Sequence, residues 1–246
     1  MSKTIIMRKY SWFIIVIPVI LGSCRHFWGR HVHGNGNART EEHSVSDFTE
    51  LEVSSTLNVH VVQGDLKPIK IEADENLLQY IEVEQDGDRV IIRNKHGFDL
   101  ESSDGMSITV SAPKFRKISV SGAGDIVGEN KITGSDDLEL NLSGAGNIKM
   151  DVDVPKLSAD ISGVGSMYLK GQTKDVELSI SGAGSAHCYD LLAENNKVEI
   201  SGVGSAEVYA SVKLDAQVSG AGSVNYKGNA PEVKQHVSGV GSVNKE

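Results

Sequence analysis

Residues 118–127 of this 246-residue chain are Ile-Ser-Val-Ser-Gly-Ala-Gly-Asp-Ile-Val, and the tetrapeptide at their centre recurs along the sequence. Copies of Ser-Gly-Ala-Gly or Ser-Gly-Val-Gly begin at Ser121, Ser143, Ser162, Ser181, Ser201, Ser219 and Ser238. Neighbouring copies are 18 to 22 residues apart. Seven copies at nearly one spacing indicate a repeat architecture, in which each repeat is one structural unit that stacks on the next.

The residues on either side of the tetrapeptide alternate between apolar and polar. The residue before each Ser is Val, Leu or Ile, and the third residue before it is apolar in every copy except the last, which has Gln235. The residue between these two is always polar, so the pattern predicts a β-strand with one buried and one exposed face. The same alternation resumes after the second glycine. A second strand therefore follows a glycine corner, and we expect the Ala or Val between the glycines to face the core.

Turns of about 19 residues, at roughly 3.3 Å per residue, give a perimeter near 60 Å, which suits a solenoid coil with short sides. Stacking such turns about 4.8 Å apart places like residues above like, so each column keeps its chemistry. We therefore predict an all-β fold, a parallel β-solenoid that is right-handed by the usual preference of parallel crossovers. The alternative is an antiparallel meander with Gly-Ala-Gly hairpins, which gives no reason for seven Ser in register.

The first half of the chain lacks the tetrapeptide but carries strand-like runs such as 57–62 and 108–110. The short run Asn76–Ile81 predicts a helical turn or an edge cap. No linker separates this part from the repeats, so we expect one β-solenoid domain over residues 44–246. Residues 44–116 would form its irregular strands, and residues 117–246 its repeats.

The N-terminus has the features of a bacterial secretion signal. Three basic residues precede the apolar run 12–21, which is too short to span a bilayer comfortably as a helix. Residues 1–23 are therefore predicted to be a lipoprotein signal peptide, because Leu21-Gly22-Ser23-Cys24 resembles a lipobox. That resemblance implies cleavage before Cys24 and acylation of Cys24, an attachment to the membrane that several acyl chains make effectively permanent. The alternative is an ordinary signal peptide with an incidental cysteine.

Residues 24–43 are predicted to be a flexible tether, because residues 25–39 show no periodicity and contain three glycines. His26, His31 and His33 lie here, but their spacing matches no metal-ligand motif, which favours a solvated tether over a metal site. Cys188 is the other cysteine of the chain, so acylation of Cys24 leaves it without a disulfide partner.

The order of these features resembles a known family. A lipobox is followed by Asp74-Glu75-Asn76-Leu77-Leu78, then by Val110-Ser111-Ala112-Pro113, and then by the repeated tetrapeptide. This order is similar to that of the Bacteroidetes lipoproteins described as putative auto-transporter adhesin, head GIN domain, over most of residues 44–246. The resemblance implies a solenoid-like envelope protein, here an outer-membrane lipoprotein, and it carries over no catalytic residue.

The composition and the columns argue against several functions. The chain has 33 acidic and 24 basic residues, and a surface this acidic disfavours nucleic acid as a partner. Ser and Asn beside the glycine corners are expected to satisfy backbone groups, because no copy has a base beside it that would make a nucleophile. Only Asp125 supplies a carboxylate after the second glycine, so a calcium repeat is not supported. We expect no enzyme, metal or cofactor, and a carbohydrate-active β-helix is the least favoured alternative.

One outward group of side chains suggests recognition. Aromatic and cationic residues recur after the corner, and we take them as the candidate binding face: Tyr168, Lys170, His187, Tyr189, Tyr209 and Lys227. Such a mixture suits contact with a glycan or a protein. Stacked Tyr rings are equally able to form a cross-strand ladder that only stabilises the fold. The predicted function is therefore a non-enzymatic, lipid-anchored envelope protein with a binding or adhesive face, and the alternative is a purely structural envelope component.

Overall fold

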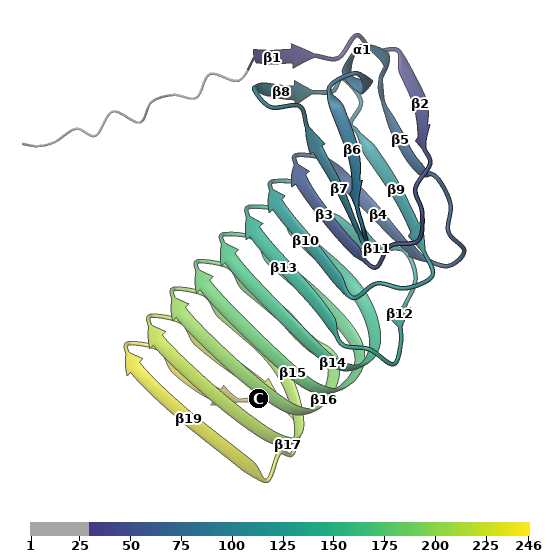
Figure 1. The fold of residues 1–246 in the computed structure, drawn as a ribbon. Coiled ribbons are helices and arrows are strands. Elements are labelled where there is room, and N and C mark those ends of the chain that lie inside the picture. Colours follow the sequence, from purple (N-terminus) through teal and green to yellow (C-terminus); the bar gives the residue numbers. More distant parts are fainter. Residues whose placement is uncertain (1–29) are drawn as a thin grey trace, which may run out of the picture.

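The computed structural model, described here for residues 30–246, is a parallel β-solenoid, as the repeats predict (Figure 1). The first residues of successive tetrapeptides lie beside one another in the sheet, Ser143 with Ser162 and Ser162 with Ser181. Every strand pairing between residues 117 and 245 is parallel. The antiparallel meander is therefore wrong.

Each turn of the repeat region runs from one glycine corner to the next. In β14 to β17 the strand continues around the whole turn, so that these elements are curved ribbons of 16 to 18 residues (Figure 1). The strands of this region are β10 (Lys117–Gly122), β11 (Ile126–Gly128), β12 (Ile132–Thr133), β13 (Leu138–Gly144), β14 (Asn147–Gly163), β15 (Ser166–Gly182), β16 (Ser185–Gly202), β17 (Ser205–Gly220), β18 (Ser223–Lys227), β19 (Glu232–Gly239) and β20 (Ser242–Lys245).

The irregular first half continues the coil and then covers its end. Strands β3 (Glu50–Ser55) and β4 (Asn58–Gln63) pair in parallel with β10 and β11, and β7 (Arg89–Asn94) and β9 (Ser107–Ala112) pair in parallel with β3 and β4. Antiparallel strands then lie over this end: β2 (Ala38–His43), β5 (Ile69–Asp74) and β6 (Ile81–Asp86). The predicted helical turn is present as α1 (Glu75–Leu78).

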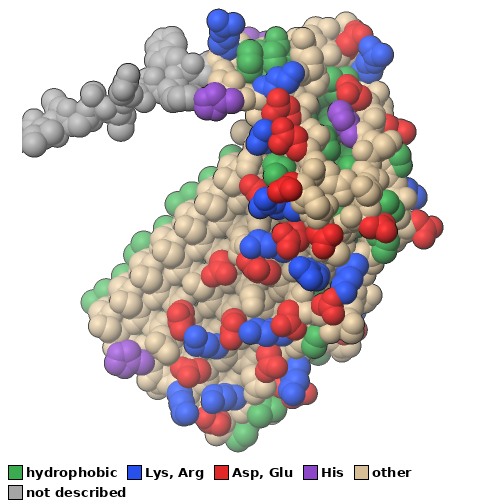
Figure 2. Space-filling model, in the orientation of Figure 1, with side chains coloured by type: hydrophobic (Ala, Val, Ile, Leu, Met, Phe, Trp, Pro, Cys, Tyr) green, Lys and Arg blue, Asp and Glu red, His purple; other side chains and the backbone are tan. Residues whose placement is uncertain are grey.

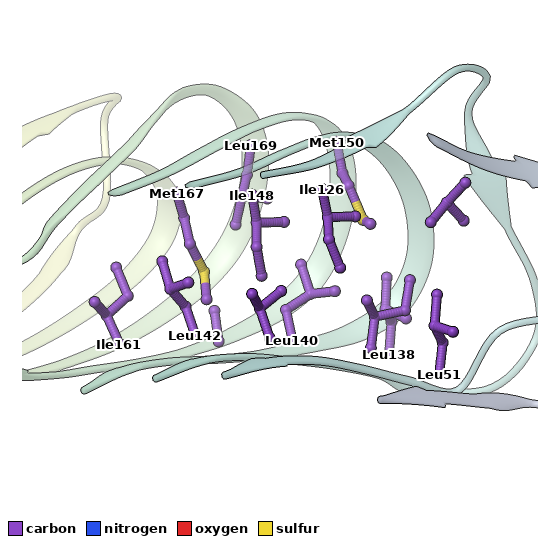
Figure 3. Close-up of a cluster of buried hydrophobic side chains, with 14 of the residues drawn as sticks. Leu51, Ile126, Leu138, Leu140, Leu142, Ile148, Met150, Ile161, Met167 and Leu169 are labelled. Atoms are coloured by element: carbon purple, nitrogen blue, oxygen red, sulfur yellow. The ribbon is translucent and has the colours of Figure 1, made fainter. Parts of the chain in front are cut away.

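The core is a column of apolar side chains that runs along the solenoid axis. The residues before the repeated Ser are buried as predicted, with exposures of 1 % for Ile161, 1 % for Ile180 and 2 % for Ile200. Figure 3 shows side chains from the opposite side of the coil, such as Ile148 and Met167, pointing toward Leu142 and Ile161 of this column. Burial of this repeated apolar column is the main favourable contribution to folding.

The glycine corner is explained by close stacking of successive turns. Gly163 has φ of +140°, a backbone conformation that other residues rarely adopt. The backbone N–H of Val164 then donates a 2.9 Å hydrogen bond to the carbonyl of Gly144 in the previous turn. A Cβ on Gly165 would lie 2.2 Å from the carbonyl oxygen of Gly146, so the second glycine is required by space.

The residue between the two glycines faces solvent, which corrects the sequence prediction that it faces the core. Val164 and Val203 are each 64 % exposed, and Val240 is 87 % exposed. The reason is that the second glycine, not this residue, occupies the inner side of the corner. Hydrophobic side chains therefore follow the corner edge of the solenoid in Figure 2.

The predicted flexible tether over residues 24–43 is wrong from Arg30 onward. Strand β1 (Arg30–His33) pairs in parallel with β8 (Phe98–Glu101), and β2 pairs with β5. Side chains of α1 and the residue before it hold the connecting turn: Gly36 N–H donates to Asp74 Oδ1 at 2.7 Å, and Asn35 N–H donates to Asn76 Oδ1 at 3.0 Å. These partners are remote in sequence, so no local periodicity revealed them. The predicted signal peptide and the predicted acylation site, Cys24, lie outside the described residues.

Candidate binding face

Three outward side chains on successive turns form a stack. Tyr168 on β15, His187 on β16 and Glu207 on β17 lie beside one another in register. The rings of Tyr168 and His187 are parallel within 14°, with centroids 4.8 Å apart. His187 Nδ1 lies 2.8 Å from Glu207 Oε2 on the next turn. The Tyr168 ring is thereby held in one orientation while 45 % of the residue stays exposed.

A register shift in β16 separates two of the other predicted residues, Tyr189 and Tyr209. The register shifts between Cys188 and Leu192, so that Tyr209 pairs with Leu192 instead of Tyr189. The four residues Lys170, Tyr189, Tyr209 and Lys227 therefore do not form the single row that equal spacing predicts. The signal for this shift is the unequal repeat length, which is 20 residues from Ser181 to Ser201 but 18 residues over the next turn.

Tyr189 is held under Lys227. The Lys227 ammonium lies 4.1 Å from the centre of the Tyr189 ring, which is the geometry of a cation–π contact. The pKa of Tyr189 is raised to about 12, first by burial and then by the nearby carboxylates of Glu246 and Glu207. This pair matches the predicted stabilising ladder better than it matches an open platform for a ligand.

Four of the six predicted residues line one hollow of about 270 Å³: Tyr168, Lys170, His187 and Tyr189. The buried side chains of Met150 and Leu169 also line it. Lys170 is 62 % exposed along its side chain, and its ammonium lies 3.7 Å from Asp151, a distance at which an exposed ion pair is weak. The hollow thus combines an oriented aromatic ring and an apolar base with residues of both charges, the basic Lys149 and Lys170 and the acidic Asp190 and Glu207. This mixture suits a polar ligand.

Tyr209 lines a second hollow of about 480 Å³. Its neighbours there include Leu192, which is 53 % exposed, and Pro155. Reasoning from the repeats missed Leu192, because only the register shift in β16 brings it beside Tyr209. Lys227 lines neither of these two hollows.

The outward charges on the side before the corner form ladders between turns. Lys117 lies 2.8 Å from Glu139, and Lys156 lies 2.9 Å from Glu177. Rows of positive and negative side chains cross this side of the molecule in Figure 2. Exposed pairs of this kind contribute about 0.2 to 1 kcal/mol each, and they help to set the register between turns.

The polar residues beside the corner contact one another across turns. The Ser185 and Ser205 hydroxyl oxygens are 3.0 Å apart, and Asn147 donates to Asp125 from both its backbone N–H and its side chain at 2.9 Å. Cys188 is buried, and burial raises the pKa of its thiol to about 12. Within residues 30–246, no group of three His, Cys, Asp or Glu side chains is arranged to hold a metal ion. His31 and His33 instead pair with Asp99 and Glu101.

The stacked parallel turns and the repeated glycine corners define the class of the protein, a capped β-solenoid. The family model described as putative auto-transporter adhesin, head GIN domain, matches residues 47–230. The chain therefore belongs to this family, as the order of its motifs indicates.

Several solved structures share this fold. A putative adhesin from Bacteroides fragilis is 25 % identical with a TM-score of 0.83, and the match covers 87 % of this chain and 100 % of the other. A putative adhesin from Parabacteroides distasonis is 26 % identical with a TM-score of 0.70, covering 88 % and 100 %. A putative lipid binding protein from the same species, 23 % identical with a TM-score of 0.75 and covering 88 % and 100 %, shares the fold. No curated protein matches the chain.

Proposed function

We propose that this chain is a lipid-anchored protein of the cell envelope that uses the side of its solenoid for binding or adhesion and catalyses no reaction. The observation that carries the binding role is the exposed Tyr168 ring, fixed by His187 at a hollow that also contains Lys170. The names of the family and of its structural relatives support an adhesive role. The lipobox that ends at Cys24 supports the anchor.

The geometry gives a reason why this site would bind well. A ring already stacked on His187 loses little conformational freedom when a ligand packs against its exposed part. A tyrosine offers a flat apolar surface and a hydroxyl, which suits a sugar ring or a protein side chain. Lys170 would attract an acidic group despite the net negative charge of the chain. A glycan or protein ligand with an acidic group is the expected partner.

The binding role is tested with immobilised glycans and extracellular-matrix proteins. Tyr168→Ala should reduce binding of the recognised ligand at least about tenfold, because the ring supplies the main contact surface. Tyr209→Ala is the matched control, since Tyr209 lines the other hollow and should leave binding unchanged. Equal binding by wild-type protein and Tyr168→Ala would exclude this site.

The anchor is tested separately in cells. Cys24→Ala should abolish labelling by a fatty-acid analogue and release the body from the membrane fraction. Unchanged membrane attachment of this variant would refute the assignment of Cys24. Among the helices of residues 30–246, none is long and apolar enough to cross a membrane.

A purely structural envelope role is the second candidate, and the contact between Lys227 and Tyr189 favours it. In that case the aromatic residues serve the stability of the turns. Tyr189→Ala would then lower the melting temperature, while no tyrosine variant would change adherence of cells. Protease treatment of intact cells decides which side of the outer membrane the body occupies.

A further inference from the structure

The two ends of the solenoid differ. The N-terminal end is covered by β2, β5 and β6, which run antiparallel to the strands beneath or beside them. At the other end of the solenoid in Figure 1, β19 pairs with β17 alone among the strands of residues 30–246. All eight residues of β19 are exposed. A long strand with one unpaired edge offers a row of backbone N–H and C=O groups to another strand.

The last turn also leaves part of the apolar column uncovered. Val233 lies in register with Leu214, and Val237 lies in register with Val218. The two residues of β17 are 0 % and 1 % exposed, whereas Val233 and Val237 are 37 % and 39 % exposed. Gln235 lies between these two valines in the inward column, where it replaces the apolar residues of the other turns. The inward side of β19 is therefore two valines around one amide.

The repeats indicate which backbone groups of β19 are free. Glu139 N–H donates to the carbonyl of the previous turn, Arg116, at 2.8 Å. Lys234 occupies the same position of its own repeat, four residues before the repeated Ser. In a parallel ladder the N–H and C=O of alternate residues point to the same neighbour. The backbone N–H and C=O groups of Val233, Gln235 and Val237 accordingly point away from β17, toward the unpaired edge of β19.

We infer that β19 pairs with β19 of a second copy of this chain, antiparallel, about a two-fold axis at Gln235. In this register Val233 lies opposite Val237 of the second copy, and the two Gln235 amides lie opposite each other. The free backbone groups of the three inward residues then face one another, which allows hydrogen bonds on both sides of the axis. The rotation keeps the inward faces on one side of the joined sheet, so the valines of both copies are covered.

The charges of β19 agree with this register. Lys234 would lie opposite His236 of the second copy. The Lys234 ammonium forms an ion pair with Glu232 of its own strand, at 3.2 Å. If either strand were displaced by two residues, Lys234 would lie opposite Lys234 of the second copy, or His236 opposite His236 of the second copy. The valines would then no longer pair. Like charges directly opposite are unfavourable, so the sequence selects one self-pairing register.

The arrangement has a consequence for adhesion that rests on the proposed lipid anchor. A two-fold axis perpendicular to the sheet reverses the solenoid direction, so the N-terminal ends of the two copies lie at opposite ends of the pair. Only five residues separate Cys24 from Arg30, a stretch of at most about 20 Å. Each N-terminal end would therefore lie close to its own membrane. Paired copies would join two facing membranes, which is adhesion between like cells.

The pairing is tested in solution with the chain from residue 24 onward carrying Cys24→Ala. Sedimentation equilibrium should show a monomer–dimer equilibrium, and Val237→Lys should weaken the dimer at least about tenfold by placing an ammonium group against the valine of the second copy. Ser238→Lys is the matched control, because residue 238 points outward and would lie opposite Glu232. Melting of both variants is compared with wild type to show that they fold. A monomer at every concentration up to about 100 μM would overturn the inference.

A cross-link identifies the register. Gln235→Cys should form a disulfide-linked dimer on mild oxidation, because residues opposite each other in a hydrogen-bonded antiparallel pair have Cα atoms about 5.5 Å apart. Lys234→Cys should cross-link much less, since Lys234 would not lie opposite itself. Equal cross-linking of the two variants would refute the two-fold axis at Gln235.

Vesicles that carry the lipidated full chain separate this inference from the proposed function. They should aggregate with wild type and not with Val237→Lys, whether or not Tyr168→Ala changes ligand binding. Dimers in solution without vesicle aggregation would overturn the link between membranes and leave the pairing standing. Aggregation that Val237→Lys does not reduce would place the contact elsewhere than β19.

Discussion

Replacing the first glycine of a corner by alanine should damage the fold far more than replacing the exposed residue beside it by a charge. Gly202 has φ of +132°, and a Cβ there would lie 2.4 Å from the carbonyl oxygen of Gly182 in the turn below. The strained backbone costs of order 1 to 3 kcal/mol, and the overlap costs about another 1 to 3 kcal/mol. Gly202→Ala is therefore expected to lose roughly 2 to 6 kcal/mol of unfolding free energy.

The control for this prediction is the next residue. Val203 is 64 % exposed, so Val203→Asp should change stability by no more than about 0.5 kcal/mol. Thermal and denaturant unfolding measure both variants, and for a chain of this size about 1 kcal/mol corresponds to 2 to 4 °C in melting temperature. Gly202→Ala should lower the melting temperature by on the order of 10 °C. Equal losses in the two variants would show that the corner residue faces the core after all.

Three other outcomes follow from burial and hydrogen bonding. Ile180→Asp should cost several kcal/mol by burying a charge, whereas Ser179→Asp on the outward side should cost little, as measured by urea unfolding. Because burial raises the pKa of Cys188 to about 12, its thiol should resist aromatic disulfide reagents until the protein unfolds, and a fast reaction in the native state would contradict this. The hydrogen bond from the backbone N–H of Ser103 lowers the pKa of Asp74 in the folded protein. The ionised Asp74 carboxylate therefore contributes to folding stability above its ordinary pKa of 3.8, and this contribution is lost as pH falls through the lower pKa of the folded state. The protection of β1 amides from hydrogen exchange, taken relative to the intrinsic rate at each pH, should therefore fall in acid only below about pH 4, and Asp74→Asn should lower it at neutral pH.

The repeat region could be predicted because each of its turns repeats the same local information. Val120, Leu142 and Ile161 occupy one column in the sequence alignment of the repeats, and the structure places them in one register. The N-terminal part could not be predicted in the same way. Strands β1 and β2 are held by β8 and β5, whose residues lie about thirty to seventy positions further along the chain. Pairing over such distances leaves no period in the strand itself.

The corner shows the limit of pattern reasoning at the level of one residue. An apolar residue between two glycines looks like a core residue, yet Val203 is exposed and Gly204 is buried. A Cβ on Gly204 would lie 2.5 Å from Ile180 Cγ2, so the absence of a side chain is what lets the core close at the corner. A hydropathy pattern assigns the inner position to the larger apolar residue. It does not show that the backbone of the stacked turns and neighbouring core side chains already fill the inner side of the corner.

The sequence identified the residue types of the candidate binding face but not how they are arranged. The difference shows how a solenoid can acquire a specific site. A solenoid of identical turns presents the same surface at every level, so a single site must arise where the repetition fails. The turn of β16 contains extra residues, and the register shift after Cys188 moves Tyr189 and Tyr209 apart. That shift leaves Tyr189 beside the hollow of Tyr168 and gives Tyr209 a different set of neighbours. In each turn, the strand segment before the corner keeps its register with the neighbouring turns and provides rigidity. The irregular segment of β16 after the corner makes one part of the surface different from all others.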